Sequence, residues 1–303
     1  MASMRDIKRR RGSIQSTQQI TKAMKLVSTV KLQHARTEAE KSKTYFDCMY
    51  ETVNHILSRV GDMDHPYLVP GNAMKKAVIV ITSNRGLAGG YNSNVVKLVT
   101  RHEGWKKEEL QIFAIGNKGR EALARNGYEI AEDLSHVAEA PTFRAAMELS
   151  DRLLELFRAG KVGEIYLAYT SFKNTVSHEP TLLRLLPVER EYHVQENHAQ
   201  GNRMQEERVQ ENNVQDSKVL MNFEPTDEEA LNRIIPKYIT SLIYGALKEA
   251  IASENGARMQ AMDNATSNAE EMISDLTLKY NRARQGSITQ ELTEIIAGAE
   301  AIS

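Results

Sequence analysis

The C-terminal stretch constrains the fold more than any other part of the sequence. From about residue 227 to residue 302, apolar residues recur every three or four positions, which is the spacing of one face of an α-helix. At 1.5 Å per residue, such a helix would extend about 110 Å. Its one proline, Pro236, lies close to the start, where a lost backbone donor costs little. A helix of this length needs a partner along its apolar face to be stable in water.

The end of this stretch has a heptad pattern. Its apolar residues are spaced four, three, four and three positions apart, at Ile288, Leu292, Ile295, Ala299 and Ile302. This spacing puts them on one seam, as in a coiled coil. Gly286 costs about 1 kcal/mol relative to alanine in a helix, and Ser287 with Gln290 could form a capping box there. We nevertheless predict an unbroken helix, because a hinge at this point would make the helix less stiff.

Residues 1–60 predict a second long helix. They contain no proline and one glycine, Gly12, and good helix formers dominate. The expected apolar stripe is made of Ile7, Ile14, Met24, Val27, Val30, Val53, Ile56 and Leu57. Prolines and glycines between residues 61 and 71 mark a linker after it. The first 43 residues are also basic, which would suit nucleic acid, an anionic membrane or an acidic protein surface.

The middle of the chain predicts an α/β domain, residues 74–192. Apolar runs rich in β-branched residues indicate strands at 77–81, 111–115, 164–169 and 182–188. Helical patterns occur between them, at about 92–101, after residue 119 to about 126, and at 142–159. Strands that alternate with helices are typical of a mostly parallel sheet. The polar residues 193–217 predict a surface excursion, or alternatively a specialised binding element.

The order of these segments predicts the architecture. The two end segments, 1–60 and 227–303, flank the α/β domain, so the simplest packing places the two long helices antiparallel and seam to seam. The C-terminal helix is the longer one, and its end should project past its partner. The fold class is therefore α/β plus coiled coil.

The sequence offers little catalytic chemistry. The turn at residues 83–90 follows a buried strand and could bind phosphate, but it lacks G-x-G-x-x-G and a following Gly-Lys-Ser/Thr. A tight strand-to-helix turn explains its glycines equally well. The eight histidines show no metal-ligand spacing, and we expect the single Cys48 to be a small buried hydrophobe. We assign no catalytic, cofactor or metal-binding residue.

Other classes are disfavoured by composition and patterning. The formal net charge is −1, and the basic N-terminal region lacks interleaved aromatic residues, so nucleic-acid binding is not supported. The basic start is not followed by the apolar run of a secretory signal, and no run of 18 apolar residues predicts a membrane span. A partner protein that presents carboxylates would explain the basic region.

Four segments resemble the γ subunit of F-type ATP synthases. They are residues 4–10 (MRDIKRR), 17–28 (TQQITKAMKLVS), 82–92 (TSNRGLAGGYN) and 280–301, which ends in ITQELTEIIAGAEA. The resemblance covers nearly the whole chain. The segment 193–217 departs from it, since it is longer and more polar than the family requires. It contains no cysteine and is therefore not the regulatory insertion of chloroplast relatives.

The resemblance implies a non-catalytic central rotor shaft, one copy per complex. In that family the end helices form an antiparallel left-handed coiled coil inside a hexameric ring of α and β subunits, and a Rossmann-like α/β domain meets the ε subunit and the membrane c-ring. The shaft itself does not insert into the membrane. The start at the family's N-terminal motif, without a transit peptide, favours the cytoplasmic face of a bacterial plasma membrane.

The resemblance also implies contact residues. Those expected to meet the β subunits are Met24, Lys25, Arg258, Gln285, Thr289 and Glu291. Those expected to form a low-friction bearing at the tip are Ile295, Ile296, Ala299 and Ile302. The alternative function is a nucleotide-binding α/β domain with a coiled-coil dimerisation stalk.

Overall fold

The computed structural model describes residues 4–59, 65–175, 177–188 and 227–300. The polar segment 193–217 lies outside the described residues. Contacts divide the chain into two compact units, Met1–Val30 with Arg258–Ser303, and Lys31–Ala257. We call the described part of the first unit the tip coil and that of the second the domain unit. No helix of the described residues is long and apolar enough to cross a membrane.

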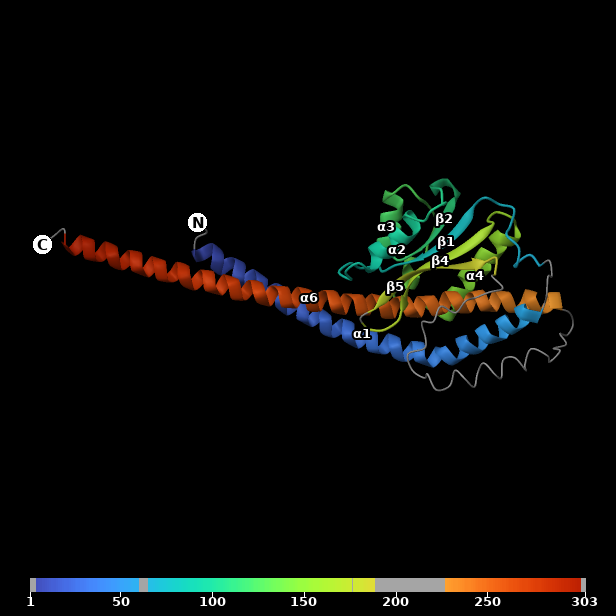
Figure 1. Ribbon diagram of the computed structural model, residues 1–303, viewed down its shortest axis with the longest axis horizontal. Helices are drawn as coiled ribbons and strands as arrows, with labels where there is room; N and C mark the ends of the chain where they lie inside the picture. The colour runs from blue at the N-terminus through green and yellow to red at the C-terminus, as the bar shows by residue number, and fades with distance from the viewer. Residues whose placement is uncertain (1–3, 60–64, 176, 189–226, 301–303) are drawn as a thin grey trace. The chain divides into compact units, whose positions relative to one another are not determined.

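Two long helices form the ends of the chain, as the sequence predicts (Figure 1). Helix α1 comprises Met4–Arg59 and helix α6 comprises Asp227–Glu300. Helix α6 continues through Gly286 without a break, and a Cβ atom added there would meet nothing within 4 Å. The prediction of an unbroken helix at this glycine is therefore confirmed.

The domain unit is built on a five-stranded sheet of order β3-β2-β1-β4-β5. The strands are β1 Lys76–Ile81, β2 Leu110–Ile115, β3 Glu129–Asp133, β4 Glu164–Phe172 and β5 His178–Leu186. Strands β1 to β4 pair in parallel, and β5 pairs antiparallel with β4. The expected mostly parallel sheet is confirmed.

Helices cover both faces of this sheet (Figure 1). On one face, α2 (Tyr91–Thr100) and α3 (Asn117–Arg125) pack on Val78 and Val80 of β1. On the other face, α4 (Phe143–Arg158) and the domain-unit parts of α1 and α6 pack on Ile79 and Ile81. Alternate residues of one buried strand thus serve two separate apolar cores. Two short 3-10 helices, η1 (Lys107–Glu109) and η2 (Ser135–Ala138), lie in the connections.

The sheet has one strand that the sequence pattern did not indicate. Strand β3 alternates exposed and half-buried positions and carries Glu129, Glu132 and Asp133, so it lacks the apolar run used to find the others. Its place at the sheet edge explains this composition, because charged side chains there discourage pairing with other chains. The last strand also begins earlier than expected, at His178, because it forms a hairpin with β4.

Candidate functional site

The tip coil is held by an antiparallel set of polar contacts between α1 and α6. Lys25 Nζ donates to Asp263 Oδ1 at 2.6 Å, and Gln18 Nε2 donates to Glu270 Oε1 at 3.0 Å. From Gln18 to Lys25 the chain advances seven residues, while the partner moves back seven, from Glu270 to Asp263. The helices are therefore antiparallel and in heptad register here, which is the geometry of a left-handed coiled coil.

A pair of buried hydroxyl groups lies between these two contacts. Thr21 and Thr266 are each 8% exposed, and their Oγ1 atoms are 2.8 Å apart. Thr266 Oγ1 also lies 2.7 Å from the carbonyl oxygen of Met262, to which it donates. Both hydroxyl groups are thus satisfied inside the coil, so their burial does not leave an unpaired polar group. The seam of α1 from Gln18 to Ser28 is mostly polar, with Met24 as its half-buried apolar member.

The apolar residues of the same α1 segment face outward. Ile20, Leu26, Val27 and Val30 are 57–62% exposed. The prediction that Val27 and Val30 belong to the inward stripe is therefore wrong. This segment of α1 has two faces, one polar and one apolar, and on each of them residues recur every three or four positions. The polar face packs against α6 because its side chains form hydrogen bonds with side chains of α6. We call Ile20, Leu26, Val27 and Val30 the outer stripe.

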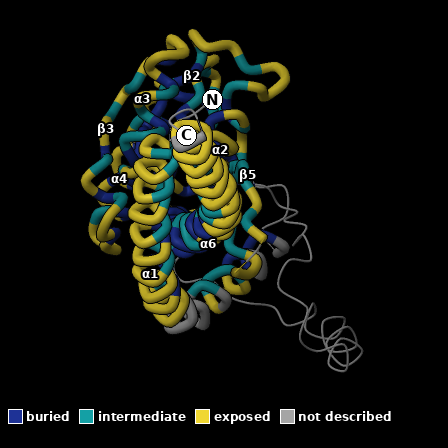
Figure 2. The backbone as a smooth tube through the Cα atoms, turned by 90° about the vertical axis from the view of Figure 1, so that its left-hand side faces the viewer, coloured by how far each residue is buried: buried dark blue, intermediate teal, exposed yellow. Residues whose placement is uncertain are grey.

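The end of α6 carries a second exposed apolar surface. Ile288, Leu292, Ile295 and Ile296 are 48–67% exposed, and the tip coil appears mostly yellow in Figure 2. Along the tip coil, the more buried positions of α6 include Leu276 and Tyr280 and, near the end of the contact with α1, Ser287. The apolar heptad that starts at Ile288 is offset from these positions by one residue, or roughly 100° around the helix. These residues therefore form a separate surface and do not continue the α1-facing seam.

The expected contact residues fall into two groups. Met24, Lys25 and Arg258 are half-buried, and Lys25 is bonded to Asp263. Gln285, Thr289 and Glu291 are exposed.

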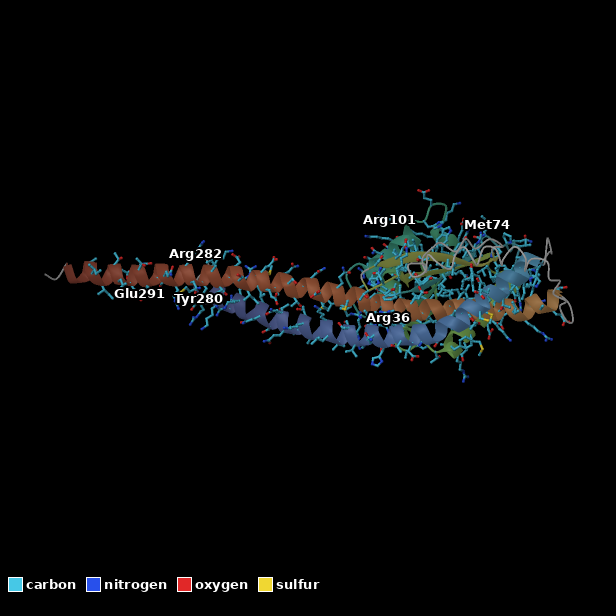
Figure 3. The ribbon with its side chains drawn as sticks, turned by 60° about the horizontal axis from the view of Figure 1, so that its bottom comes forward. Arg36, Met74, Arg101, Tyr280, Arg282 and Glu291 are labelled. Carbon is cyan, nitrogen blue, oxygen red and sulfur yellow. The ribbon has the colours of Figure 1, made fainter. Side chains whose placement is uncertain are left out.

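Figure 3 shows Glu291 projecting from α6, whereas Tyr280 lies beside α1. The Arg11 guanidinium lies over the Tyr280 ring at 5.4 Å. Of the expected bearing residues, Ile295 and Ile296 are exposed, while the side chains of Ala299 and Ile302 lie outside the described residues. Sequence reasoning missed the outer stripe: it did not name Ile20 or Leu26, and it placed Val27 and Val30 on the inward face. Only the exposure of these side chains in the structure reveals this surface.

Side-chain hydrogen bonds tie the glycine-containing turn after β1 to its surroundings. Two backbone N–H groups at the start of α3 bind side chains at the start of this turn: Gly119 N donates to Thr82 Oγ1 at 2.9 Å, and Asn117 N donates to Asn84 Oδ1 at 3.0 Å. Ser83 N donates to Asn92 Oδ1 of α2 at 2.9 Å. These bonds fix the turn between the sheet, α2 and α3.

The metal-site and cysteine candidates were also compared with the structure. Among the described residues, no group of three or more His, Cys, Asp or Glu side chains could hold a metal ion. Cys48 is exposed, so the expectation of a buried cysteine is wrong.

Comparison with known proteins gives the family. A family model described as ATP synthase matches residues 3–302. The ATP synthase gamma chain of Lachnoclostridium phytofermentans is 63% identical over the full length of both chains. The sodium-ion-specific ATP synthase gamma chain of Acetobacterium woodii is 39% identical over 99% of both. This chain belongs to the ATP synthase gamma chain family.

Solved structures support the fold. A chain of the Euglena gracilis mitochondrial ATP synthase matches with a TM-score of 0.64 and 18% identity, covering 99% of this chain and 94% of that one. A chain of the Tetrahymena thermophila central stalk matches with a TM-score of 0.54 and 24% identity, covering 81% and 99%. This chain thus shares its fold with chains of these two ATP synthase structures.

Proposed function

We propose that this chain is the central rotor shaft of an F-type ATP synthase and is not itself catalytic. It would turn inside a hexameric ring of α and β subunits and couple ion flow through the membrane sector to ATP synthesis or hydrolysis on the β subunits. The observation that carries this proposal is the arrangement of α1 in the tip coil, where mostly polar residues face α6 and the apolar outer stripe is exposed. Exposed apolar surface of this kind indicates a partner protein.

The outer stripe sharpens the expected contacts with the β subunits. Leu26 and Val27 follow directly after Met24 and Lys25 and are more exposed than either. Because Lys25 is bonded to Asp263, we propose that it positions α1 on α6 and that the outer stripe supplies the apolar contact. Arg258, Gln285, Thr289 and Glu291 remain the proposed polar contacts with the β subunits.

The end of α6 suits a bearing. Ile295 and Ile296 offer apolar surface without directional bonds, so a rotating tip would not have to break a hydrogen bond at each step. We propose that Ala299 and Ile302 continue this surface. Exposed isoleucines would be costly in a free subunit and are explained by a surrounding sleeve.

The mechanism is a population shift in the ring. Each orientation of an asymmetric shaft favours one conformation of each β subunit, in proportion to the difference in contact free energy between conformations. One elementary charge that crosses a membrane yields about 2.3 kcal/mol per 100 mV. Several ions must therefore be pooled for one ATP, and a stiff shaft of two packed helices is suited to that task.

The other partners follow from the same proposal. The α/β domain would meet the ε subunit and the c-ring, with one copy of this chain in each complex. The complex would lie on the cytoplasmic face of a bacterial plasma membrane, with this chain peripheral. The division into segments 1–60, 74–192, 193–217 and 227–303 stays a prediction, as does the role of 193–217.

A charge in the outer stripe tests the proposal. Leu26→Asp with Val27→Asp should greatly weaken binding of the full chain to a reconstituted α/β hexamer, because both side chains would be desolvated at the interface. Gln15→Asp, at an exposed polar position of the same helix, is the matched control and should bind normally. Co-purification and hexamer ATPase activity are the measurements.

Two results would contradict the proposal. One is normal assembly and rotation-coupled activity of the doubly charged variant. The other is micromolar nucleotide binding by the chain alone, without a hexameric partner, which would support the nucleotide-binding alternative.

A further inference from the structure

Two turns of α6 in the domain unit can be approached closely by neighbouring segments because their residues are small. Ala250, Ser253 and Gly256 recur at every third position and are buried. A Cβ atom added to Gly256 would lie 2.6 Å from Cε1 of His178, so the imidazole rests directly on the helix backbone. Such close approach lets neighbouring segments contact the backbone of the helix directly.

The first contact on this turn comes from the glycine-containing motif. Tyr91, the first residue of α2, is 5% exposed, and its hydroxyl donates to the carbonyl oxygen of Ala250 at 3.1 Å. A carbonyl oxygen has two lone pairs, so it can accept this bond beside the helical one. Helical carbonyls point along the helix axis, and the bond therefore opposes sliding of α6 along its axis.

The second contact comes from the hairpin of β4 and β5. The Glu249 carboxylate oxygen Oε2 accepts from Ser171 Oγ at 2.9 Å and from Phe172 N at 3.3 Å. Hydrogen bonds to an ionised group are stronger than neutral ones. Burial and, secondly, the nearby Glu249 charge raise the pKa of Tyr169, so this side chain stays neutral beside the carboxylate. A bond through a side chain that projects sideways opposes rotation of the helix about its axis.

The third contact is the ring of His178, which lies on Gly256 and 5.8 Å from the Phe172 ring. The close approach leaves no room for a side chain on Gly256, so the ring packs against the helix backbone at this position.

From these contacts we propose that Tyr91, Ser171, Phe172 and His178 form a collar around Glu249–Gly256 that locks the α/β domain to α6 against sliding and rotation. They are positioning residues. The glycine-containing motif, anchored through Ser83 and Asn92, thus helps to fix Tyr91. In the proposed rotor, torque between the shaft and the foot domain would pass through this collar, and that part of the inference rests on the proposed function.

Removal of one contact and weakening of the other test the collar in the full chain. Tyr91→Phe removes one hydroxyl, and Glu249→Gln keeps the shape but removes the charge. Each should speed hydrogen exchange of the amides in 249–256 and 171–175 roughly fivefold, the factor for about one net hydrogen bond. Tyr128→Phe, at a buried tyrosine of the core on the other face of the sheet, is the control and should leave those amides unchanged.

A second variant acts through packing. Gly256→Ala should displace His178 and speed exchange in the hairpin, whereas Gly286→Ala in the same helix should not, because its added Cβ meets nothing. Unchanged exchange in Tyr91→Phe, Glu249→Gln and Gly256→Ala would overturn the collar as a structural clamp.

The torque role is tested in the assembled complex. The double variant Tyr91→Phe, Glu249→Gln should keep hexamer ATP hydrolysis but lose a large part of ATP-driven ion pumping into vesicles, and restoring Tyr91 should recover pumping. Faster exchange with full pumping would overturn the torque role alone. Failure of the unaltered chain to assemble with the hexamer would instead overturn the proposed function and leave the clamp standing.

Discussion

Helix α6 is buried in two very different ways along its length. In the domain unit it contributes a continuous set of apolar side chains, none more than 4% exposed: Leu231, Ile235, Tyr238, Ile239, Ile243, Ala246, Leu247 and Ala250. In the tip coil, Ile295 and Ile296 are more than 60% exposed, and the contacts with α1 include an ion pair and two buried hydroxyl groups.

The difference in burial shows that the two parts of α6 are stabilised in different ways. The domain-unit segment gains its stability from burial against a sheet and another helix, and this term grows with the apolar area removed from water. The tip coil leaves several large apolar residues exposed, and its interior combines the buried Met262 and Leu276 with polar contacts. Polar contacts contribute little net free energy but have strict geometry. The tip is therefore well defined in register and weakly stabilised by itself.

Truncation of a core residue of the domain unit should change the free energy of unfolding most. Ile239→Ala should lower the free energy of unfolding of the domain unit by about 2–5 kcal/mol, because it removes buried methyl groups and leaves a cavity. Ile239 is fully buried. Urea unfolding followed by circular dichroism measures the change.

The matched change at the tip is Ile295→Ala, which should shift the same transition by no more than about 0.5 kcal/mol. In the assembled complex the same variant should reduce coupling instead. Equal destabilisation by the two truncations would show that the tip is packed within the free chain, contrary to the comparison.

Acid should act on the domain unit rather than on the tip coil. Burial lowers the pKa of His178 and of His65 below the ordinary value. The unfolded chain therefore takes up protons first, and stability falls as the pH drops through about 6.5 toward the folded pKa values. Below the folded values these groups cause no further loss, and above about pH 7 their contribution is complete.

Unfolding midpoints at pH 7.5 and pH 5.5 measure this effect. His178→Gln should reduce the difference between the two, while His34→Gln, at an exposed position of α1, should leave it unchanged. A pH dependence that persists unchanged in variants of both His178 and His65 would refute the assignment.

A stiffening substitution should have the smallest effect. Gly286→Ala should stabilise the tip coil by up to about 1 kcal/mol, because alanine loses less backbone entropy in a helix. The added Cβ atom meets nothing within 4 Å, so no contact opposes the gain. Hydrogen exchange around residue 286 measures it, and faster exchange would mean that the glycine is needed for the helix geometry.

Much of the fold could be predicted from local pattern. The run of β-branched residues from Ala77 to Ile81 and the helical spacing in α4 each indicate their element without reference to the rest of the chain. Strand β3 could not be found this way, because an edge strand with charged side chains resembles a loop in sequence. The long end helices were predictable from their helical apolar spacing and the scarcity of proline, and their antiparallel pairing was predictable because they flank one α/β domain.

The functional surfaces were less predictable. The exposed end of α6 followed from its greater length, and its heptad pattern was visible in the sequence. The outer stripe was not, because Val27 and Val30 were assigned to the inward face. Nor did the turn at 83–90 reveal that its neighbour Tyr91 binds a carbonyl of α6, since the partner Ala250 is 159 residues away.

By itself, the sequence determined that the chain has two long helices around a mostly parallel α/β domain, because backbone propensity and periodicity are local properties. Only the tertiary structure decided which face of α1 turns inward. Two faces of that helix carry spacings of three and four residues, and Asp263, Thr266 and Glu270 of α6 select the polar one. The choice depends on bonding partners more than 200 residues away in the chain, and for that reason no local pattern could reveal it.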